Sequence, residues 1–183
     1  MGASSPRAHR QGQGRPNVVP ISGGSPAAGG PIPPRFERQL RGAARRRRGD
    51  ESPWVAVARV DGVDHIRREY GDPAAEEFLR GTASVLRSTL RESDKLAPVA
   101  RAEYGILLDA PSGDDAVAGL QRLVEKVREL AGRDHRWSTG SLSVGVTPLW
   151  TDEPAAIIAR ARTALERSGS DGAARVVMAT ALR

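Results

Sequence analysis

The stretch Arg91-Glu92-Ser93-Asp94 brings together two side chains that are suited to recognising a charged ligand. A planar guanidinium donates two parallel hydrogen bonds to a phosphate or to the edge of a guanine, and a carboxylate three residues away accepts hydrogen bonds from the base. The same spacing recurs in Arg47-Arg48-Gly49-Asp50, and the aspartate of such a loop also caps turns. Ligand binding and turn capping therefore both remain open as interpretations of this pattern.

Other residues capable of chemistry are sparse. His9, His65 and His135 are scattered, without the spacing of a metal site or of a catalytic dyad. The chain contains no cysteine, which excludes a thiolate metal site and a disulfide framework. Its three tryptophans are too dispersed for a nucleic-acid stacking platform. We expect no metal, no cofactor, no catalytic residue and no specific nucleic acid.

The residues after Asp94 predict a β-hairpin. Residues 95–101 and 104–108 form two short apolar runs, which is typical of paired strands. We place the tight link between them at Ala102-Glu103, although neither residue is a glycine.

Further elements follow from periodicity and from capping signals. Asp72-Pro73 is typical of a helix start, and apolar residues then recur at helical spacing through Leu90. The next helix begins at Ser112 or Asp114, with acids in its first turn and basic residues near its end. The predicted strands are 54–60, 95–101, 104–108, 142–146 and 175–178, and the predicted helices are 35–48, 72–90, 112–130 and 154–167.

Composition divides the 183 residues into a tail and one domain. Residues 1–34 are rich in Gly, Pro and Ser, with too little apolar surface to offset the entropy of ordering, so we predict a disordered tail. Residues 35–50 form an Arg-rich lead-in helix, and residues 51–180 form the domain. Residues 1–50 carry a net charge of +8 and the rest −2, so the tail is basic and the domain slightly acidic.

Localisation is predicted from two absences in the sequence. No apolar run reaches the length of about 18 residues that a transmembrane helix needs, and the first residues lack the apolar core of a signal peptide. We expect a cytoplasmic protein.

The order of elements resembles that of the GGDEF family of diguanylate cyclases over residues 36–178. The resemblance is carried by VDGVDHIRREYGD after the first strand, by the hairpin VARAEYGILL and by the late strand SVGV. It implies an α/β (α+β) fold like the palm of nucleotide polymerases and cyclases, with a central antiparallel sheet flanked by helices.

The resemblance also implies that the catalytic signature is degenerate. In active members the hairpin turn is Gly-Gly-Asp/Glu-Glu-Phe, where the glycines admit a triphosphate and the acids hold two Mg²⁺ ions. The corresponding residues here are Ala100, Arg101, Ala102, Glu103 and Tyr104. We expect the surviving Glu103 to pair with Arg59 or Arg101.

Other catalytic positions of the family are also changed. The second metal-ligating acid aligns with Arg59 and the guanine-reading asparagine with Arg67, although Glu76 could still contact guanine. The phosphate-binding lysine and arginine align with Gly169 and Ala173. The family's opening Leu-Thr-Gly-Leu…Asn-Arg-Arg segment is replaced by AAGGPIPPRF. The resemblance therefore implies an inactive cyclase, and a weak nucleotide hydrolase that uses Glu103 is a minor alternative.

A binding function is what the resemblance leaves. Active members bind their product, cyclic di-GMP, at an Arg-x-x-Asp motif that precedes the signature by five residues, where Arg91 and Asp94 stand. Arg122 aligns with a second arginine that often contacts the product. We expect a non-catalytic cyclic di-GMP receptor that signals to an unidentified protein or to a second copy of the chain. The alternative is a nucleotide-independent interaction module.

Overall fold

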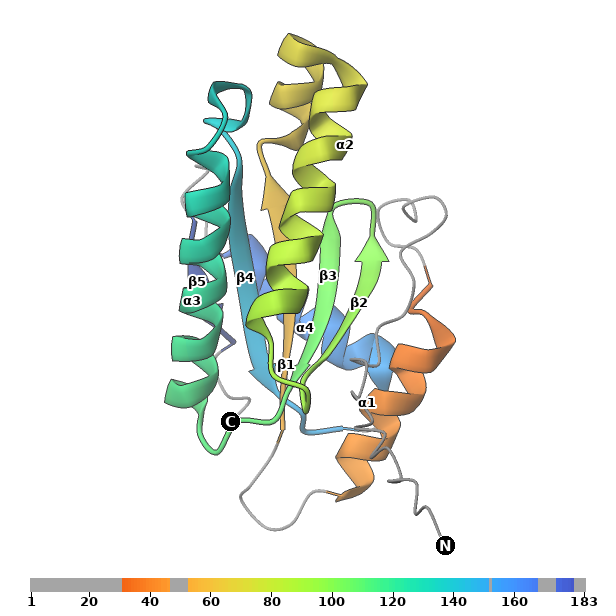
Figure 1. The fold of residues 1–183 in the computed structure, drawn as a ribbon. Coiled ribbons are helices and arrows are strands. Elements are labelled where there is room, and N and C mark those ends of the chain that lie inside the picture. Colours follow the sequence, from red (N-terminus) through yellow and green to blue (C-terminus); the bar gives the residue numbers. More distant parts are fainter. Residues whose placement is uncertain (1–30, 47–52, 152, 168–173, 180–183) are drawn as a thin grey trace, which may run out of the picture.

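The computed structural model describes residues 31–46, 53–151, 153–167 and 174–179. Four α-helices, a short 3₁₀ helix and five strands follow one another in these ranges (Figure 1). In chain order they are α1 (Pro34–Arg46), β1 (Trp54–Asp61), α2 (Val63–Thr89), β2 (Lys95–Ala100), β3 (Glu103–Leu108), α3 (Gly113–Ala131), η1 (His135–Trp137), β4 (Ser141–Pro148), α4 (Pro154–Glu166) and β5 (Val176–Met178). Residues 1–30 of the predicted tail lie outside the described residues, and residues 31–34 are described.

The five strands form one mixed sheet in the order β2-β3-β1-β4-β5. All neighbouring pairs are antiparallel except β4 and β5, which are parallel. The prediction of a central antiparallel sheet is confirmed, and β5 adds a parallel strand at one edge. The physical reason is that α4 intervenes between β4 and β5, and such a crossover returns the chain to the same end of the sheet.

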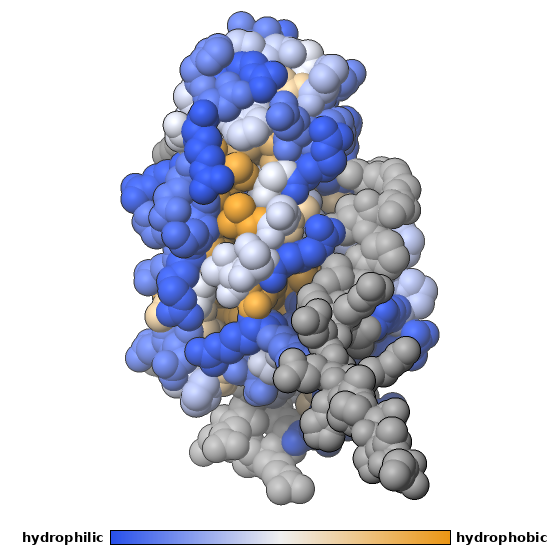
Figure 2. All heavy atoms as spheres, in the orientation of Figure 1, coloured by the Kyte–Doolittle hydropathy of each residue, from blue (hydrophilic) through white to orange (hydrophobic). Residues whose placement is uncertain are grey.

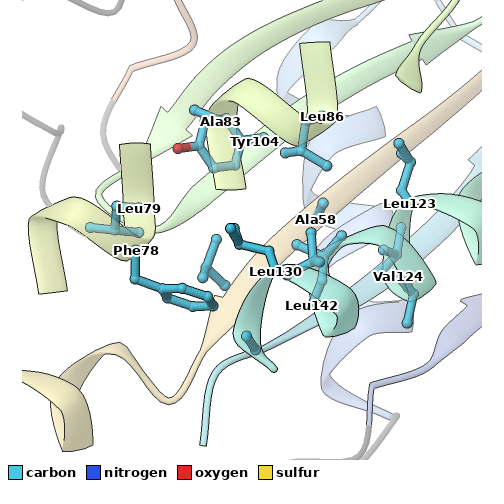
Figure 3. Close-up of a cluster of buried hydrophobic side chains, with 14 of the residues drawn as sticks. Ala58, Phe78, Leu79, Ala83, Leu86, Tyr104, Leu123, Val124, Leu130 and Leu142 are labelled. Carbon is cyan, nitrogen blue, oxygen red and sulfur yellow. The ribbon is translucent and has the colours of Figure 1, made fainter. Parts of the chain in front are cut away.

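Helices cover both faces of the sheet, with α2 and α3 in front of it in Figure 1 and α4 behind it. Two hydrophobic clusters match this arrangement, and β1 contributes to both because alternate side chains of a strand point to opposite faces. Ala56 and Ala58 belong to the cluster under α2 and α3, whereas Val55 and Val57 belong to the cluster under α1 and α4. Figure 3 shows side chains of the first cluster between these helices and the sheet. The surface over this cluster shows a narrow apolar strip between polar side chains (Figure 2).

The lead-in helix is part of the second cluster. Phe36, Leu40 and Ala43 lie on one face of α1 and are buried. The arginines of α1 occupy its other faces, as the spacing predicted. This helix therefore has a packed position against the sheet, and it forms one wall of a groove that is described below.

The second helix begins earlier than the sequence predicted. It starts at Val63, and the residue inside it with non-helical geometry is Gly71 (φ 83°, ψ 169°), just before Asp72-Pro73. The predicted start at Asp72-Pro73 thus marks a kink between two helical segments. The first segment was missed because it contributes only two buried residues, Val63 and Ile66, which is too few for a clear helical period.

The hairpin turn also differs by one residue from the prediction. Ala100 pairs with Glu103, so the turn consists of Arg101 and Ala102, and Glu103 is already in the strand. The register shifts between Pro98 and Ala100, because Pro98 has no N–H to donate to the ladder. This placement gives Glu103 a fixed orientation on the sheet.

Candidate functional site

The predicted binding residues meet at one pocket. Arg91 and Asp94 lie in the loop between α2 and β2, and Arg122 lies on α3. All three line a pocket of about 180 Å³, whose rim includes residues 108–111 at the end of β3. The fold therefore brings together two guanidinium groups and one carboxylate that are up to 31 positions apart in the sequence.

Asp94 is held in place by two backbone groups. Its Oδ2 accepts a hydrogen bond from the N–H of Arg91 at 3.0 Å, and its Oδ1 accepts one from the N–H of Asp109 at 3.1 Å. The carboxylate thus caps the loop and ties it to the end of β3, as the capping interpretation predicted. Because a carboxylate offers about four acceptor positions, two remain for a ligand.

The two arginines of this pocket have no acidic partner among the described residues. Neither Arg91 nor Arg122 has a carboxylate within 4.0 Å among the described residues. Asp115 also lines the pocket, but it accepts a 2.6 Å hydrogen bond from the hydroxyl of Ser112, the N-cap of α3. The pocket thus offers two guanidinium groups without a direct acidic partner, while Asp94, Asp109 and Asp115 also line it. This combination suits a ligand that has both anionic groups and hydrogen-bond donors.

The signature hairpin faces a second pocket, of about 400 Å³, at the other end of the sheet. Arg59 on β1 lies opposite Glu103 on β3 in the strand register. The sequence predicted that Glu103 pairs with Arg59 or Arg101, and this prediction is wrong. Oε2 of Glu103 accepts a hydrogen bond from Nε of Arg162 at 2.8 Å, and Nη2 of Arg162 donates to the carbonyl of Val99 at 3.3 Å.

The expected pairing was wrong because the partner of Glu103 comes from a helix that is distant in the sequence. Arg162 lies on α4, 59 positions away from Glu103 in the sequence, and the fold brings the two side chains together. Its side chain is 26% exposed and that of Glu103 is 18% exposed, so the ion pair is largely removed from solvent.

Arg59 has a different partner that the sequence analysis overlooked. Its Nε donates to Oδ1 of Asp61 at 3.1 Å, and the hydroxyl of Ser143 donates to Oδ2 of the same carboxylate at 2.5 Å. Asp61 directly follows the strand that the sequence predicts at residues 54–60. Its position two residues after Arg59 was a usable signal, because residues i and i+2 of a strand share one face.

The remaining arginines of this second pocket are also matched by acids. Arg67 donates from Nη1 to Asp64 and from Nε to Asp72, each at 2.8 Å. Glu76, the residue that the resemblance assigned to guanine, lies 4.0 Å from Arg67 and 3.9 Å from Arg101. Gly169 and Ala173 lie outside the described residues.

Metal ligands are not gathered anywhere in the described part of the chain. No three His, Cys, Asp or Glu side chains there are close enough together to hold a metal ion. His135 is exposed and its ring packs edge-on against Tyr70 at 5.9 Å, while His65 lines the second pocket. His9 lies outside the described residues.

Two side chains outside the Arg91 pocket have shifted pKa values. Burial raises the pKa of Tyr104, whose ring lies in the core between α2 and the sheet. The hydrogen bonds from the side chain and backbone of Arg136 lower the pKa of Asp134 to about 2. Neither group adjoins the pocket of Arg91, so these shifts describe structural contacts.

Comparison with known proteins agrees with this fold. Residues 34–175 match the sequence model of the family described as diguanylate cyclase, GGDEF domain. The GGDEF domain of DgcB from Caulobacter crescentus, determined in complex with c-di-GMP, has a TM-score of 0.67 at 22% identity, covering 79% of this chain and 88% of that chain. Diguanylate cyclase SiaD from Pseudomonas aeruginosa, determined with its activator SiaC, has a TM-score of 0.67 at 29% identity, covering 79% of this chain and 57% of that chain.

A curated relative is similar over a shorter range. The cyclic di-GMP phosphodiesterase NbdA from Pseudomonas aeruginosa is 32% identical over 96 residues, which are 51% of this chain and 12% of that protein. The chain therefore matches a small part of this relative's length.

The fold, with a mixed sheet between helices, defines a palm-like domain related to cyclic di-GMP signalling proteins. The chain belongs to the GGDEF domain family of diguanylate cyclases. In the part that the structure describes, no helix is long and apolar enough to cross a membrane.

Proposed function

We propose that this GGDEF domain is a non-catalytic, cytoplasmic receptor that binds cyclic di-GMP through Arg91, Asp94 and Arg122. The observation that carries the proposal is the contrast between its two pockets. The arginines of the signature pocket are paired with acids, whereas Arg91 and Arg122 have no carboxylate partner among the described residues. The guanidinium groups that remain free to engage an anion are thus in the binding pocket, beside Asp94, Asp109 and Asp115.

The proposed loss of catalysis rests on charge at the metal positions. Active members need two acids there for Mg²⁺, and this chain has Arg59 and Ala102. The guanidinium of Arg59 is held over the hairpin by Asp61, and the remaining acid, Glu103, already carries the guanidinium of Arg162. A divalent cation would have to displace one cation and approach another, so the residues present do not fit the metal.

Ligand recognition then follows from the same hydrogen bonds that fix the loop. Asp94 is oriented by the N–H groups of Arg91 and Asp109, so its free acceptor positions are fixed before a ligand arrives. Two guanidinium groups beside it supply donors for phosphate and for the acceptor edge of guanine. A preformed site of this kind loses little entropy on binding.

Calorimetric titration of the full chain with cyclic di-GMP tests the proposal. We expect measurable heat and an increase in melting temperature, because a ligand that binds only the folded state stabilises it. GTP should not compete for this site. Absence of both heat and thermal shift well above micromolar ligand would overturn the receptor function.

A second candidate is a nucleotide-independent interaction module. The double hydrogen bond of Asp94 to backbone N–H groups favours it, since that bond explains the aspartate without any ligand. The same titration separates the two candidates, because an interaction module would show neither heat nor thermal shift.

A further inference from the structure

A larger hollow adjoins the Arg91 pocket and is not used by the proposed receptor site. It measures about 910 Å³ and lies between α1 and the loops that precede β2 and follow β3. Its basic lining consists of Arg35, Arg38, Arg46, Arg91 and Lys95. Asp109 is the single acid that lines it among the described residues. We call this hollow the α1 groove.

Much of the positive charge of the α1 groove is uncompensated. Arg38, Arg46 and Arg91 have no carboxylate within 4.0 Å in the described ranges. Arg41, on the same helix but outside the groove, pairs with Glu37 at 2.9 Å and with Glu153 at 3.5 Å. Arg41 is thus neutralised outside the groove, whereas Arg38 and Arg46 remain cationic within it, where neighbouring guanidinium groups attract an anionic partner.

The floor of the α1 groove is apolar and contains no aromatic side chain. Ala43, Leu107 and Leu108 are nearly buried in it, and prolines line its ends. Nucleic-acid grooves usually add aromatic side chains on which bases stack, and none lines this one. A peptide with acidic and apolar side chains would match both the basic walls and the apolar floor.

The chain's own N-terminal segment is a poor occupant on grounds of charge. Residues 1–30 contain three arginines and no acid, so they carry the same sign as the groove. The charge of this segment therefore favours an occupant from another molecule.

We propose that the α1 groove is a docking site for an acidic, partly apolar segment of a partner protein. Arg91 and residues 108–111 line both this groove and the pocket of Asp94 and Arg122. A ligand that engages the guanidinium of Arg91 removes one cation from the groove, so the two binding events are linked. This linkage rests on the proposed receptor function, whereas docking itself does not.

Fluorescence anisotropy with a short labelled peptide of alternating glutamate and leucine tests the docking site on the full chain. Arg38→Glu and Arg46→Glu should each weaken binding by about fivefold or more, because each reverses a charge in the groove. Arg45→Glu is the matched control, since Arg45 is exposed on the same helix but does not line the groove. It should change the affinity by less than about twofold.

Equal weakening by all three variants, or no binding by the wild type, would overturn the docking site. Tighter binding of a single-stranded oligonucleotide than of the peptide would replace the partner protein with a nucleic acid. Concentration-dependent self-association that Arg46→Glu abolishes would replace it with a second copy of the chain. The variants change exposed side chains, and circular dichroism should show an unaltered fold.

Saturating cyclic di-GMP tests the linkage separately. We expect it to raise the dissociation constant of the peptide, because the ligand removes one cation from the groove. An unchanged constant, with ligand binding visible by calorimetry, would disprove the linkage. If calorimetry shows no ligand binding, the receptor function fails while peptide docking still stands.

Discussion

Arg162 on α4 donates from Nε to Oε2 of Glu103 on β3 at 2.8 Å, so the acid at the start of β3 is held by a guanidinium. The same guanidinium donates to the carbonyl of Val99 on β2. It thereby connects α4 to both strands of the hairpin. The guanidinium of Arg162 thus neutralises a carboxylate at a position where active members of the family hold metal ions.

Arg162→Ala should destabilise the domain by about 1–3 kcal/mol, because it leaves the largely buried carboxylate of Glu103 without its partner. Urea unfolding measures the change. Arg128→Ala is the control: its pair with Glu125 is exposed on α3, and its loss should cost less than about 0.5 kcal/mol. The double variant Arg162→Ala/Glu103→Gln should recover part of the loss. Equal costs for Arg162→Ala and Arg128→Ala would mean that the hairpin pair is not structural.

Restoring the metal-ligating acids should not restore the cyclase. The wild type should form no cyclic di-GMP from GTP with Mg²⁺ or Mn²⁺, and Arg59→Asp/Ala102→Asp should also form none. Arg101 still occupies the place of a signature glycine, and Arg162 still occupies Glu103. Chromatography of the nucleotides measures the product. Turnover that scales with protein concentration in either protein would contradict the proposed loss of catalysis.

Ligand binding should depend on the pocket residues individually. Arg91→Ala should weaken cyclic di-GMP binding at least about tenfold, since one bidentate contact contributes roughly 1–3 kcal/mol. Asp94→Asn should have a smaller effect, because an amide keeps one acceptor but turns its NH₂ toward donors. Calorimetry gives both values. Arg47→Ala, in the tail pattern with the same spacing, should leave binding unchanged, and a loss there would indicate nonspecific attraction of phosphate, which added salt would abolish.

Gly62→Ala should destabilise the domain by at least about 2 kcal/mol. Gly62 has φ 79°, and a Cβ there would lie 2.2 Å from the carbonyl oxygen of Thr139. Thermal unfolding measures the loss. Gly119→Ala is the control: a Cβ on this glycine of α3 would meet no atom closer than 3.6 Å, so the variant should be neutral or slightly more stable. Equal destabilisation by the two variants would exclude the close approach at Gly62.

Asp134 should titrate far below an ordinary aspartate, at about pH 2, because Arg136 hydrogen-bonds its charged form. A depressed folded-state pKa means that the associated stability is present above the unfolded value of 3.8 and is lost as pH falls through about 2. NMR titration of the carboxyl carbon measures this pKa. In Arg136→Gln it should move up toward 3.8, and an unchanged value would assign the shift to another cause.

Local sequence was sufficient for most elements and for the spacing of the binding residues. β1 was predicted as residues 54–60 and observed as Trp54–Asp61, because a buried central strand needs a continuous apolar run. Ser112 was predicted as a start of α3 and is its N-cap, since its side chain accepts from the N–H of Asp115. Such signals act within a few residues, where the chain's own geometry brings the groups together.

What the sequence left undecided depends on groups that are distant along the chain. The partner of Glu103 is 59 positions away on α4. Ser143, which donates to Asp61, is 82 positions away from it on β4. The parallel placement of β5 likewise depends on the path of the chain over the sheet. Residue type and spacing therefore determined the elements and the candidate motif of Arg91 and Asp94. Only the tertiary packing decided which charges are neutralised and which remain available to a ligand, because opposite charges pair according to distance in space.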